Sequence, residues 1–415
     1  MKNKITSILI VCIFIVSIGS VYAADGDVLW AKTHAGPFGV DIAYGVATDS
    51  QNNVIVTGAV TNSSGNADYY TIKYDPSGNV IWSKTYAGLL GIDEARGVAT
   101  DSQNNVIVTG FSVTGISSDY YTIKYDASGN VVWSKTHGGP AGADYGYGVA
   151  TDSQNNVIVT GSVNYGGSNP WSDYYTIKYD PSGNVIWSKR YTGPAGIDEA
   201  YGVATDSQNN VIVTGKVLNL SGNDDYYTIK YDPSGNVIWS KTHAGPFGDD
   251  EAWGVTTDTQ NNVIVTGSVT NSSGNYDYYT IKYDASGNEV WSKTYDSTYG
   301  DDRPFSVTAD SYNNVIVTGK VRNSSGNDDY YTIKYDPSGN VIWSKTHAGT
   351  FGADVALGVA TDSQNNVIVT GAVTNSSGNY DYYTIKYQGV PPVKPVKKSL
   401  PIHQIMKILG LSPKE

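Results

Sequence analysis

The chain has 415 residues, which exceeds one ordinary domain of about 100–200 residues and favours several units or one repeat array. With 46 Gly, 34 Tyr, 40% hydrophobic and only 16% charged residues, wholesale disorder and long charged helices are excluded. Residues 24–387 carry 20 basic and 38 acidic side chains, and this net charge of −18 argues against binding to nucleic acid.

Residues 1–23 have the features of a secretory signal peptide. Lys2 and Lys4 precede an apolar stretch of about fifteen residues, and the small residues at its end predict cleavage before Ala24. The alternative is a retained anchor, but the stretch is shorter than the roughly twenty residues that span a bilayer. The only cysteine, Cys12, lies in this segment, so disulfides and thiolate sites are excluded from the mature chain. We expect a secreted or cell-surface protein without a transmembrane span after cleavage.

Residues 24–387 contain seven copies of one unit. Each copy has the string NNVIVTG, a tryptophan within WSK or WAK, and the segment DYYTIKY. Successive NNVIVTG strings are spaced by 52, 51, 54, 52, 52 and 52 residues. They end at Gly58, Gly110, Gly161, Gly215, Gly267, Gly319 and Gly371.

Each unit is predicted to form four short strands. In the second unit these are residues 97–101, 105–110, 119–125 and 130–136, all rich in β-branched and aromatic residues. The connections SQNN and DPSGN or DASGN have the residues of tight hairpin turns. Four antiparallel strands repeated every 52 residues or so are typical of the blades of a β-propeller.

The phase of the repeat predicts how the ring closes. The body opens with a fourth strand at residues 28–33 and ends with a third strand at residues 382–387. In a closed ring the N-terminal strand completes the seventh blade and removes an exposed edge. An open β-solenoid is the alternative, but such a fold would not require the fourth strand of the last unit to stand at the N-terminus. We therefore predict an all-β, seven-bladed propeller over residues 24–387.

The repeat also resembles a known family. The patterns Y-D-x-S-G-N-V-x-W-S and G-x-D-x-A-x-G-V-A-T-D-S-x-N-N-V-I-V-T-G are similar to the bacterial and archaeal beta-propeller (SBBP-type) repeats over about residues 26–387. This resemblance implies a secreted or cell-surface propeller without one common activity. A weaker similarity joins D-x-S-G-N-V-I-W to the tryptophan-docking repeats of quinoprotein dehydrogenases. Those enzymes have eight blades and a cysteine pair, so we expect no quinone cofactor.

The loops are predicted to sort onto two faces of the ring. SQNN and DPSGN share one face, here the floor face, and are nearly identical in all units. The loops between strands two and three and between strands four and one share the opposite face, here the long-loop face. Length and variation concentrate there, which is typical of binding loops on a rigid scaffold.

Two sets of residues at the end of the four–one loops are candidates for binding. One is an aligned aspartate: Asp41, Asp93, Asp144, Asp198, Asp250, Asp302 and Asp354. The other is a variable position three residues later: Tyr44, Arg96, Tyr147, Tyr201, Trp253, Phe305 and Leu357. Together with Glu94, Glu199, Glu251 and Asp249 they predict an acidic, aromatic-rimmed channel mouth suited to a cation, a basic peptide or a sugar. The alternative is that the aspartates only cap a turn or bond the next blade, since a structural device repeats whereas a site breaks symmetry.

Three features depart most from the repeat. The third unit has a longer two–three loop, residues 164–173, with the extra Trp171. The sixth four–one loop brings Asp301, Asp302 and Arg303 together, and Arg96 is the only basic residue of its column. These are candidate binding residues, with neutral drift among repeats as the alternative.

Two further patterns suggest metal sites, but each has a simpler explanation. His34, His137, His243 and His347 stand where tyrosine stands in other units, so we expect them to pack on the outer strand. The order Asp75, Ser77, Asn79 resembles the start of a calcium loop, but the distal Glu is absent and a turn explains it. We expect no cofactor.

Residues 388–415 form a separate piece. Residues 388–399 are a Pro/Lys-rich linker, and residues 400–415 have apolar spacing that predicts a short helix or a frayed tail.

The whole sequence favours a non-catalytic scaffold that acts through the long-loop face. The expected partner is an extracellular glycan, a cell-wall component or a protein. The alternative is an extracellular polysaccharide hydrolase or lyase at the central channel, for which Arg303, Asp301 and Asp302 are the nearest candidate set.

Overall fold

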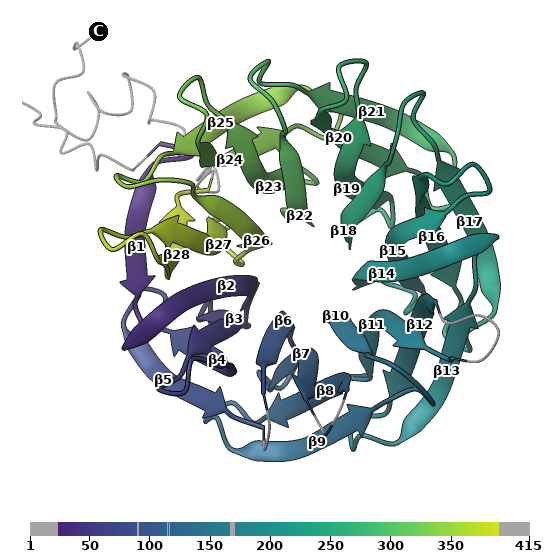
Figure 1. The fold of residues 1–415 in the computed structure, drawn as a ribbon, viewed down its shortest axis with the longest axis horizontal. Helices are drawn as coiled ribbons and strands as arrows, with labels where there is room; N and C mark the ends of the chain where they lie inside the picture. Colours follow the sequence, from purple (N-terminus) through teal and green to yellow (C-terminus); the bar gives the residue numbers. More distant parts are fainter. Residues whose placement is uncertain (1–23, 89–90, 114, 116, 167–170, 390–415) are drawn as a thin grey trace, which may run out of the picture.

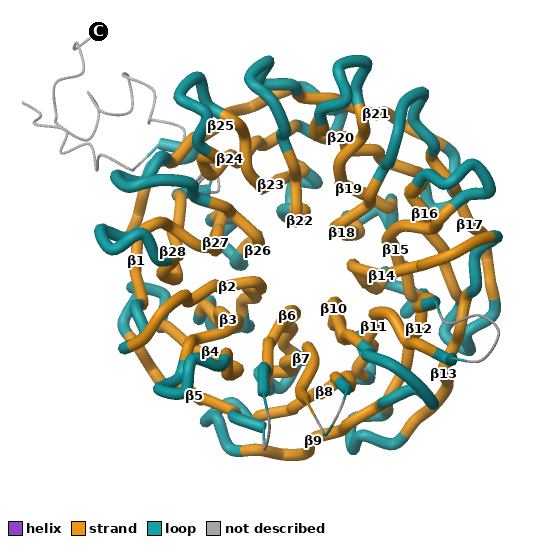
Figure 2. Tube along the Cα trace, in the orientation of Figure 1, coloured by secondary structure: helices purple, strands orange, loops and turns teal. Residues whose placement is uncertain are grey.

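The structure is a computed structural model that describes residues 24–88, 91–113, 115, 117–166 and 171–389. These residues form 28 strands in seven four-stranded antiparallel sheets, arranged as blades around a central channel (Figure 1). Figure 2 shows that loops and turns connect the strands. None of the described residues forms a helix long and apolar enough to cross a membrane. The predicted seven-bladed fold is confirmed, whereas the expected signal peptide and C-terminal segment lie outside the described residues.

Each blade runs from the channel outwards. The innermost strands are β2 (Phe38–Thr48), β6 (Asp93–Thr100), β10 (Tyr145–Thr151), β14 (Ala195–Thr205), β18 (Glu251–Thr257), β22 (Arg303–Ala309) and β26 (Val355–Thr361). The second strands are β3 (Val54–Thr61), β7 (Val106–Val113), β11 (Val157–Asn164), β15 (Val211–Leu218), β19 (Val263–Thr270), β23 (Val315–Arg322) and β27 (Val367–Thr374).

The third strands are β4 (Ala67–Tyr74), β8 (Ser118–Tyr125), β12 (Ser172–Tyr179), β16 (Asp224–Tyr231), β20 (Tyr276–Tyr283), β24 (Asp328–Tyr335) and β28 (Tyr380–Tyr387). The outermost strands are β1 (Val28–His34), β5 (Val80–Tyr86), β9 (Val131–His137), β13 (Val185–Tyr191), β17 (Val237–His243), β21 (Glu289–Tyr295) and β25 (Val341–His347). Blade one is β2–β5, and each later blade takes the next four strands, except that blade seven combines β26–β28 with β1.

The hydrophobic core lies between the blades. In β3, Val54 and Val56 pack with Ile368 of blade seven, whereas Ile55 packs with Val106 and other residues of blade two. This division follows from the strand geometry, because successive side chains point to opposite faces of a sheet. The VIVTG string is therefore apolar without alternation, since both of its faces are covered by neighbouring blades.

Buried polar contacts on the floor face also repeat around the ring. Lys73 Nζ lies 2.9 Å from Asp49 Oδ2 in blade one, and the equivalent pair occurs in every blade. Trp82 Nε1 donates to the Ala127 carbonyl of the next blade at 3.2 Å. These bonds fix the floor loops as structural connections, as their near-identity predicted.

The N-terminal strand closes the ring. Strand β1 pairs antiparallel with β28, with His34 opposite Tyr382. Gly26 N donates to the Gln388 carbonyl at 2.8 Å, and Gln388 N donates to the Asp27 carbonyl at 2.7 Å. The predicted closure is confirmed, and it leaves blade seven held together without a covalent link between its third and fourth strands.

Candidate functional site

One extra residue interrupts the innermost strand of every blade. In β6, Ala95 pairs with Gly110 and Gly97 pairs with Thr109, so Arg96 between them has no pairing partner. The same register shift occurs in all seven blades. Such a bulge bends the strand and redirects a side chain. The bulged residues are the variable column of the sequence: Tyr44, Arg96, Tyr147, Tyr201, Trp253, Phe305 and Leu357.

In six of the seven blades a glycine follows the bulged residue and allows the neighbouring blade to approach closely at the channel, whereas blade six has Ser306 in this position. A Cβ on Gly97 would lie 2.8 Å from the Tyr147 carbonyl oxygen, and one on Gly148 would lie 2.9 Å from the Tyr201 carbonyl oxygen. Only glycine fits these contacts without a backbone shift. The channel wall therefore consists of closely packed backbone from neighbouring blades, and the bulged side chains project from it.

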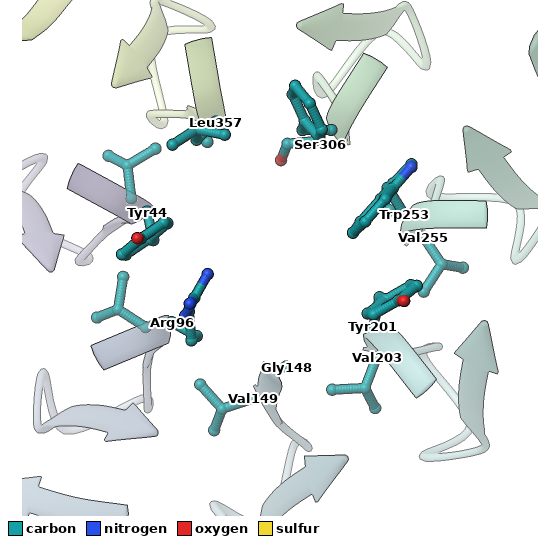
Figure 3. A pocket seen from close by; sticks show the side chains of 18 of the residues that line it. Tyr44, Arg96, Gly148, Val149, Tyr201, Val203, Trp253, Val255, Ser306 and Leu357 are labelled. Carbon is teal, nitrogen blue, oxygen red and sulfur yellow. The ribbon is translucent and has the colours of Figure 1, made fainter. Parts of the chain in front are cut away.

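These side chains line a cavity of about 180 Å³ in the channel (Figure 3). Six of the seven bulged residues contribute to its lining, and in blade three Gly148 and Val149 do so instead of Tyr147. The bulged residues, which differ most between the repeats, thus line the cavity together with the nearly invariant residues that follow them.

Aromatic rings form a continuous arc on one side of the channel. The ring centroids of Tyr147 and Tyr201 lie 5.2 Å apart, and Tyr201 stacks on Trp253 at 4.3 Å. Phe305 meets Trp253 edge to face at 5.6 Å. On the other side the Arg96 guanidinium stacks over Tyr44 at 4.1 Å. Figure 3 shows Tyr201 and Trp253 on the side of the channel opposite Tyr44 and Arg96.

Carboxylates accompany this arc. The Tyr201 hydroxyl donates to Glu199 at 2.6 Å, and Arg96 forms an ion pair with Glu94. Burial, followed by the negative charge of Glu199, raises the pKa of Tyr201 well above 10. Burial also raises the pKa of Tyr44 to about 12. Both hydroxyls are therefore neutral hydrogen-bonding groups at physiological pH.

The aligned aspartates are not among the residues that line the cavity. Asp198 is fully buried, and its carboxylate accepts the backbone N–H of Gly193 at 2.5 Å and of Leu218 at 3.2 Å. The other six aspartates are also 0–1% exposed. Each of the seven accepts a backbone N–H five residues earlier, and burial raises the pKa of Asp198 to about 7. They fix the four–one loops from inside and do not line the cavity, whereas Glu199 and Glu94 bond the lining residues Tyr201 and Arg96.

A set of ion pairs on blades four to six was not predicted. Lys216 Nζ lies 2.8 Å from Asp224 Oδ2 and 3.4 Å from Glu251 Oε1. Arg303 Nη1 lies 3.4 Å from Glu251 Oε2, and its guanidinium stacks over Tyr276 at 3.8 Å. A signal was present in the sequence, because the residue after VIVTG and the residue before DYY also vary between units.

Strand pairing explains why these variable positions meet. The residue after VIVTG lies opposite the residue after the aligned aspartate, as in the pairs Glu199 with Lys216 and Arg303 with Lys320. We call the bulged residues together with Glu94, Glu199, Glu251, Lys216, Asp224, Tyr276, Arg303 and Lys320 the funnel.

The side chains of Asp301, Asp302 and Arg303 at the end of the sixth four–one loop do not point to one common site. Asp302 accepts backbone and side-chain groups of Ser297, whereas Asp301 accepts the backbone N–H of Tyr276 at 3.0 Å. Arg303 points to Glu251 instead. The predicted catalytic candidates are therefore separated by their own hydrogen bonds. Trp171 is 47% exposed just before β12 and is not among the residues lining the cavity.

The histidines pack as predicted. His243 stacks on Tyr279 of the third strand of the next blade at 4.4 Å, and Tyr86 stacks on Tyr121 in the equivalent place at 4.2 Å. Asp75 accepts two backbone N–H groups and the Asn79 amide, which is a turn. Within the described ranges, no three His, Cys, Asp or Glu side chains are placed to hold a metal ion.

Solved structures share the propeller fold at low sequence identity. Virginiamycin B lyase from Staphylococcus aureus, in a catalytically inactive form with quinupristin, is 12% identical with a TM-score of 0.55. The similarity covers 86% of this chain and 98% of that one. The polysaccharide lyase Uly1 is 10% identical with a TM-score of 0.52, covering 86% of this chain and 91% of that one. These likenesses show the fold alone.

Sequence comparison gives a more direct relation. A WD repeat-containing protein of Acanthamoeba polyphaga mimivirus, L264, described as uncharacterized, is 30% identical over 130 residues. The match covers 27% of this chain and only 9% of that protein. The PQQ_2 family, described as outer membrane protein assembly factor BamB, matches residues 16–232 and 71–321. Because these matches together span most of the sequence, the chain belongs to this family of β-propeller repeat proteins.

Proposed function

We propose that this propeller is a non-catalytic binding scaffold outside the cytoplasm, and that its funnel is the binding surface. The proposal rests on the positions at which the sequences of the repeats differ. Four variable columns meet on one side of the ring, namely the bulged residue, the residue after the aligned aspartate, the residue after VIVTG and the residue before DYY. Within the strands, which are otherwise nearly identical in all seven blades, the differences thus lie at one continuous surface.

The placement of basic residues supports the same conclusion. Of the 20 basic residues in 24–387, 14 belong to two seven-fold sets, the buried lysines of strand three and the lysines of WSK or WAK. The other six all form ion pairs with carboxylates, and five of them lie at or beside the funnel. They are Arg96, Arg190, Lys216, Arg303, Lys320 and Arg322.

This arrangement favours binding over catalysis. A catalytic set needs unlike groups that converge on one reacting atom. Here each funnel cation is already neutralised by a carboxylate, and Arg303, Asp301 and Asp302 diverge. Paired charges beside aromatic rings suit recognition of a polar ligand. A hydrolase or lyase remains the second candidate, and turnover of a polysaccharide would favour it.

The proposed location outside the cytoplasm rests on two observations. The first 23 residues have the pattern of a signal peptide, and the family is described as an outer membrane protein assembly factor. Cell fractionation with N-terminal sequencing tests this directly. We expect the protein outside the cytoplasm with Ala24 as its first residue, whereas a cytoplasmic chain that begins at Met1 would contradict the proposal.

Binding is tested by screening the purified protein against glycans, cell-wall fractions and basic peptides. The variant Arg303→Gln should weaken binding of the retained ligand about tenfold without lowering the melting temperature by more than a few degrees, since it removes a charged contact. Gln51→Glu on the floor face is the matched control and should bind as the parent does. Equal losses in both variants, or no loss in either, would place binding outside the funnel.

A further inference from the structure

At the closing seam, the turn between the third and fourth strands of a blade is formed by two separate segments. In blade one the turn is the continuous segment of residues 75–79. In blade seven the third strand β28 and the fourth strand β1 come from opposite ends of the propeller and lie side by side (Figure 1). Gln388 and residues 24–27 therefore form the equivalent turn together.

Backbone hydrogen bonds show which residues of the two turns are equivalent. Gly78 N donates to the Asp75 carbonyl at 2.9 Å, and Gly26 N donates in the same way to the Gln388 carbonyl at 2.8 Å. Both glycines have a φ of 83°, in the left-handed region that this turn requires. Gln388 N in turn donates to the Asp27 carbonyl at 2.7 Å, as Asp75 N does to the last residue of its own turn. Gln388 therefore occupies the place of Asp75, and the N-terminal residues supply the rest of the turn.

Ala24 is the first residue that this turn takes from the N-terminal segment. It corresponds to Pro76, the residue after Asp75. Because Gln388 already occupies the place of Asp75, a residue before Ala24 has no position within the turn. The sequence pattern predicts cleavage at the same bond. The register of the turn and the signal-peptide pattern thus both point to a chain that begins at Ala24.

A carboxylate is placed to receive the amino group of such a chain. Ala24 N donates to Asp27 Oδ2 at 2.6 Å. In the six continuous turns the position of Asp27 is always asparagine, and the position of Asp25 is always serine. The closing turn thus has two carboxylates, whereas each continuous turn has only that of its first aspartate.

The lysines at the seam do not pair with both of these carboxylates. Lys334 Nζ lies 3.6 Å from Asp25 Oδ2, but it lies closer, at 3.1 Å, to Asp310 Oδ2. A Cβ on Gly26 would lie 2.8 Å from Lys345 Cε, so the stem of that lysine packs on the turn. Within the part of the chain that the structure describes, the donor that bonds the Asp27 carboxylate is Ala24 N. A positive charge on this nitrogen makes the bond an ion pair, and such charge-assisted bonds are roughly twice as strong as neutral ones.

We propose that removal of residues 1–23 completes the closing seam, because it creates an α-ammonium group at Ala24 that pairs with the Asp27 carboxylate. This proposal rests on the proposed location outside the cytoplasm, which requires the same cleavage. Before cleavage the Asp27 carboxylate meets only a neutral peptide N–H. Ring closure is thus coupled to processing, and the mature propeller is held more tightly at β1 than its precursor.

The test compares two purified chains that both end at Glu415. One begins at Ala24 with a free amino group, and the other carries Gly-Ser-Gly-Ser before Ala24. NMR titration of the first chain, labelled with 13C-alanine, should give an α-amino pKa above the roughly 7.7–8.0 of an ordinary N-terminus. Asp27→Asn should return this pKa to the ordinary range. The variant should still fold, since the continuous turns have asparagine in this place.

The two chains should also differ in thermal stability in a pH-dependent way. Pairing raises the α-amino pKa, so its contribution is complete below about pH 7.7 and is lost as the pH rises through the raised value. At pH 7 the chain that begins at Ala24 should melt about 1–3 °C higher than the extended chain, the range expected for an exposed ion pair. The difference should vanish by about pH 10 and should be absent at any pH in Asp27→Asn. The other charged groups at this turn are the same in both chains: Asp25, Lys334, Lys345 and Asp310.

Glu289→Gln is the matched control, because it removes one negative charge from an exposed side chain on β21 of blade five. It should leave the raised pKa and the difference in melting temperature unchanged. An ordinary α-amino pKa in the parent, or equal melting of the two chains at pH 7, would overturn the proposal. Because the test chain is made to begin at Ala24, this failure would leave the location outside the cytoplasm standing, whereas a native chain that begins at Met1 would overturn the location itself.

Discussion

At the scale of single residues, the bulged position of each innermost strand is where the side chain can vary without disturbing the sheet. The bulged residue of each innermost strand has no pairing partner, so its side chain is released from the requirements of the sheet. Arg96, Tyr201 and Trp253 therefore differ freely, whereas the glycine that follows each of them is fixed by the neighbouring backbone. Variation at the channel is the consequence of a backbone irregularity that every blade shares.

Two classes of buried aspartate should make the stability of the fold depend on pH in opposite directions. Burial raises the pKa of Asp198 to about 7 from 3.8, so between about pH 4 and 7 the folded chain keeps a proton that the unfolded chain releases. This contribution to stability is present in acid and is lost as the pH rises towards 7. Burial also acts to raise the pKa of Asp49, but hydrogen bonds from Lys73 and Asn53 outweigh it and lower the pKa. The contribution of Asp49 is thus present above about pH 4 and lost below it.

Asp198→Asn and Asp49→Asn test this difference. In urea unfolding at pH 4, 5.5 and 7, the free-energy difference between the parent and Asp198→Asn should shrink as the pH rises, by at most roughly 1.4 kcal/mol per pH unit. The difference between the parent and Asp49→Asn should stay constant over the same range. A constant difference for Asp198→Asn would show that its carboxyl group titrates normally in the folded chain.

At the scale of elements, the position of a strand in its blade decides how much its side chains stabilise the fold. The second strand is covered on both faces by adjacent blades, and Ile55 is completely buried. The outermost strand has one free edge, and Ile81 on β5 is 49% exposed. Two isoleucines in the same blade thus have very different surroundings.

The pair Ile55→Ala and Ile81→Ala measures this contrast. Ile55→Ala removes buried methyl groups and leaves a cavity between blades one and two, so it should cost about 2–5 kcal/mol. Ile81→Ala removes methyl groups that largely face solvent and should cost about 0.5 kcal/mol or less. Chemical denaturation followed by tryptophan fluorescence gives both values, and equal losses would mean that the blades do not pack through their second strands.

At the scale of the whole molecule, the ring depends on a contact between the two ends of the propeller. Six tryptophans donate Nε1 to a carbonyl in the next blade, whereas Trp343, which faces the closing seam, has no partner among the described residues. Asp25 at the same seam has no hydrogen-bond partner in the described part of the chain, although Lys334 lies 3.6 Å away. The closing seam is thus less completely bonded than the other six.

Removal of residues 24–34 should therefore open the ring at β28. We expect the melting temperature to fall by ~10 °C or more, because β28 loses its partner strand and becomes an exposed edge. Addition of a synthetic peptide with the sequence of residues 24–35 should restore most of the loss. Differential scanning calorimetry measures both effects. An unchanged melting temperature after the deletion would contradict the role of β1 as the closing strand.

The sequence alone was sufficient for the fold and for the position of the channel residues. Strand order, blade number and closure follow from local patterns repeated seven times, because each unit has the same turns and the same apolar strand. The column of Tyr44, Arg96 and Trp253 could be found because its members differ while their neighbours do not. Both conclusions need only comparison between repeats.

Only the tertiary structure decided what the polar residues do. Asp198 and Tyr201 are three residues apart, yet one carboxylate is buried against loop N–H groups and the other side chain lies at the channel, because the bulge shifts the register between them. The pairing of Lys216 with Asp224 and Glu251 joins three strands of two blades. A charged side chain finds its partner across strand registers and blade seams, and these distances are set when the ring closes.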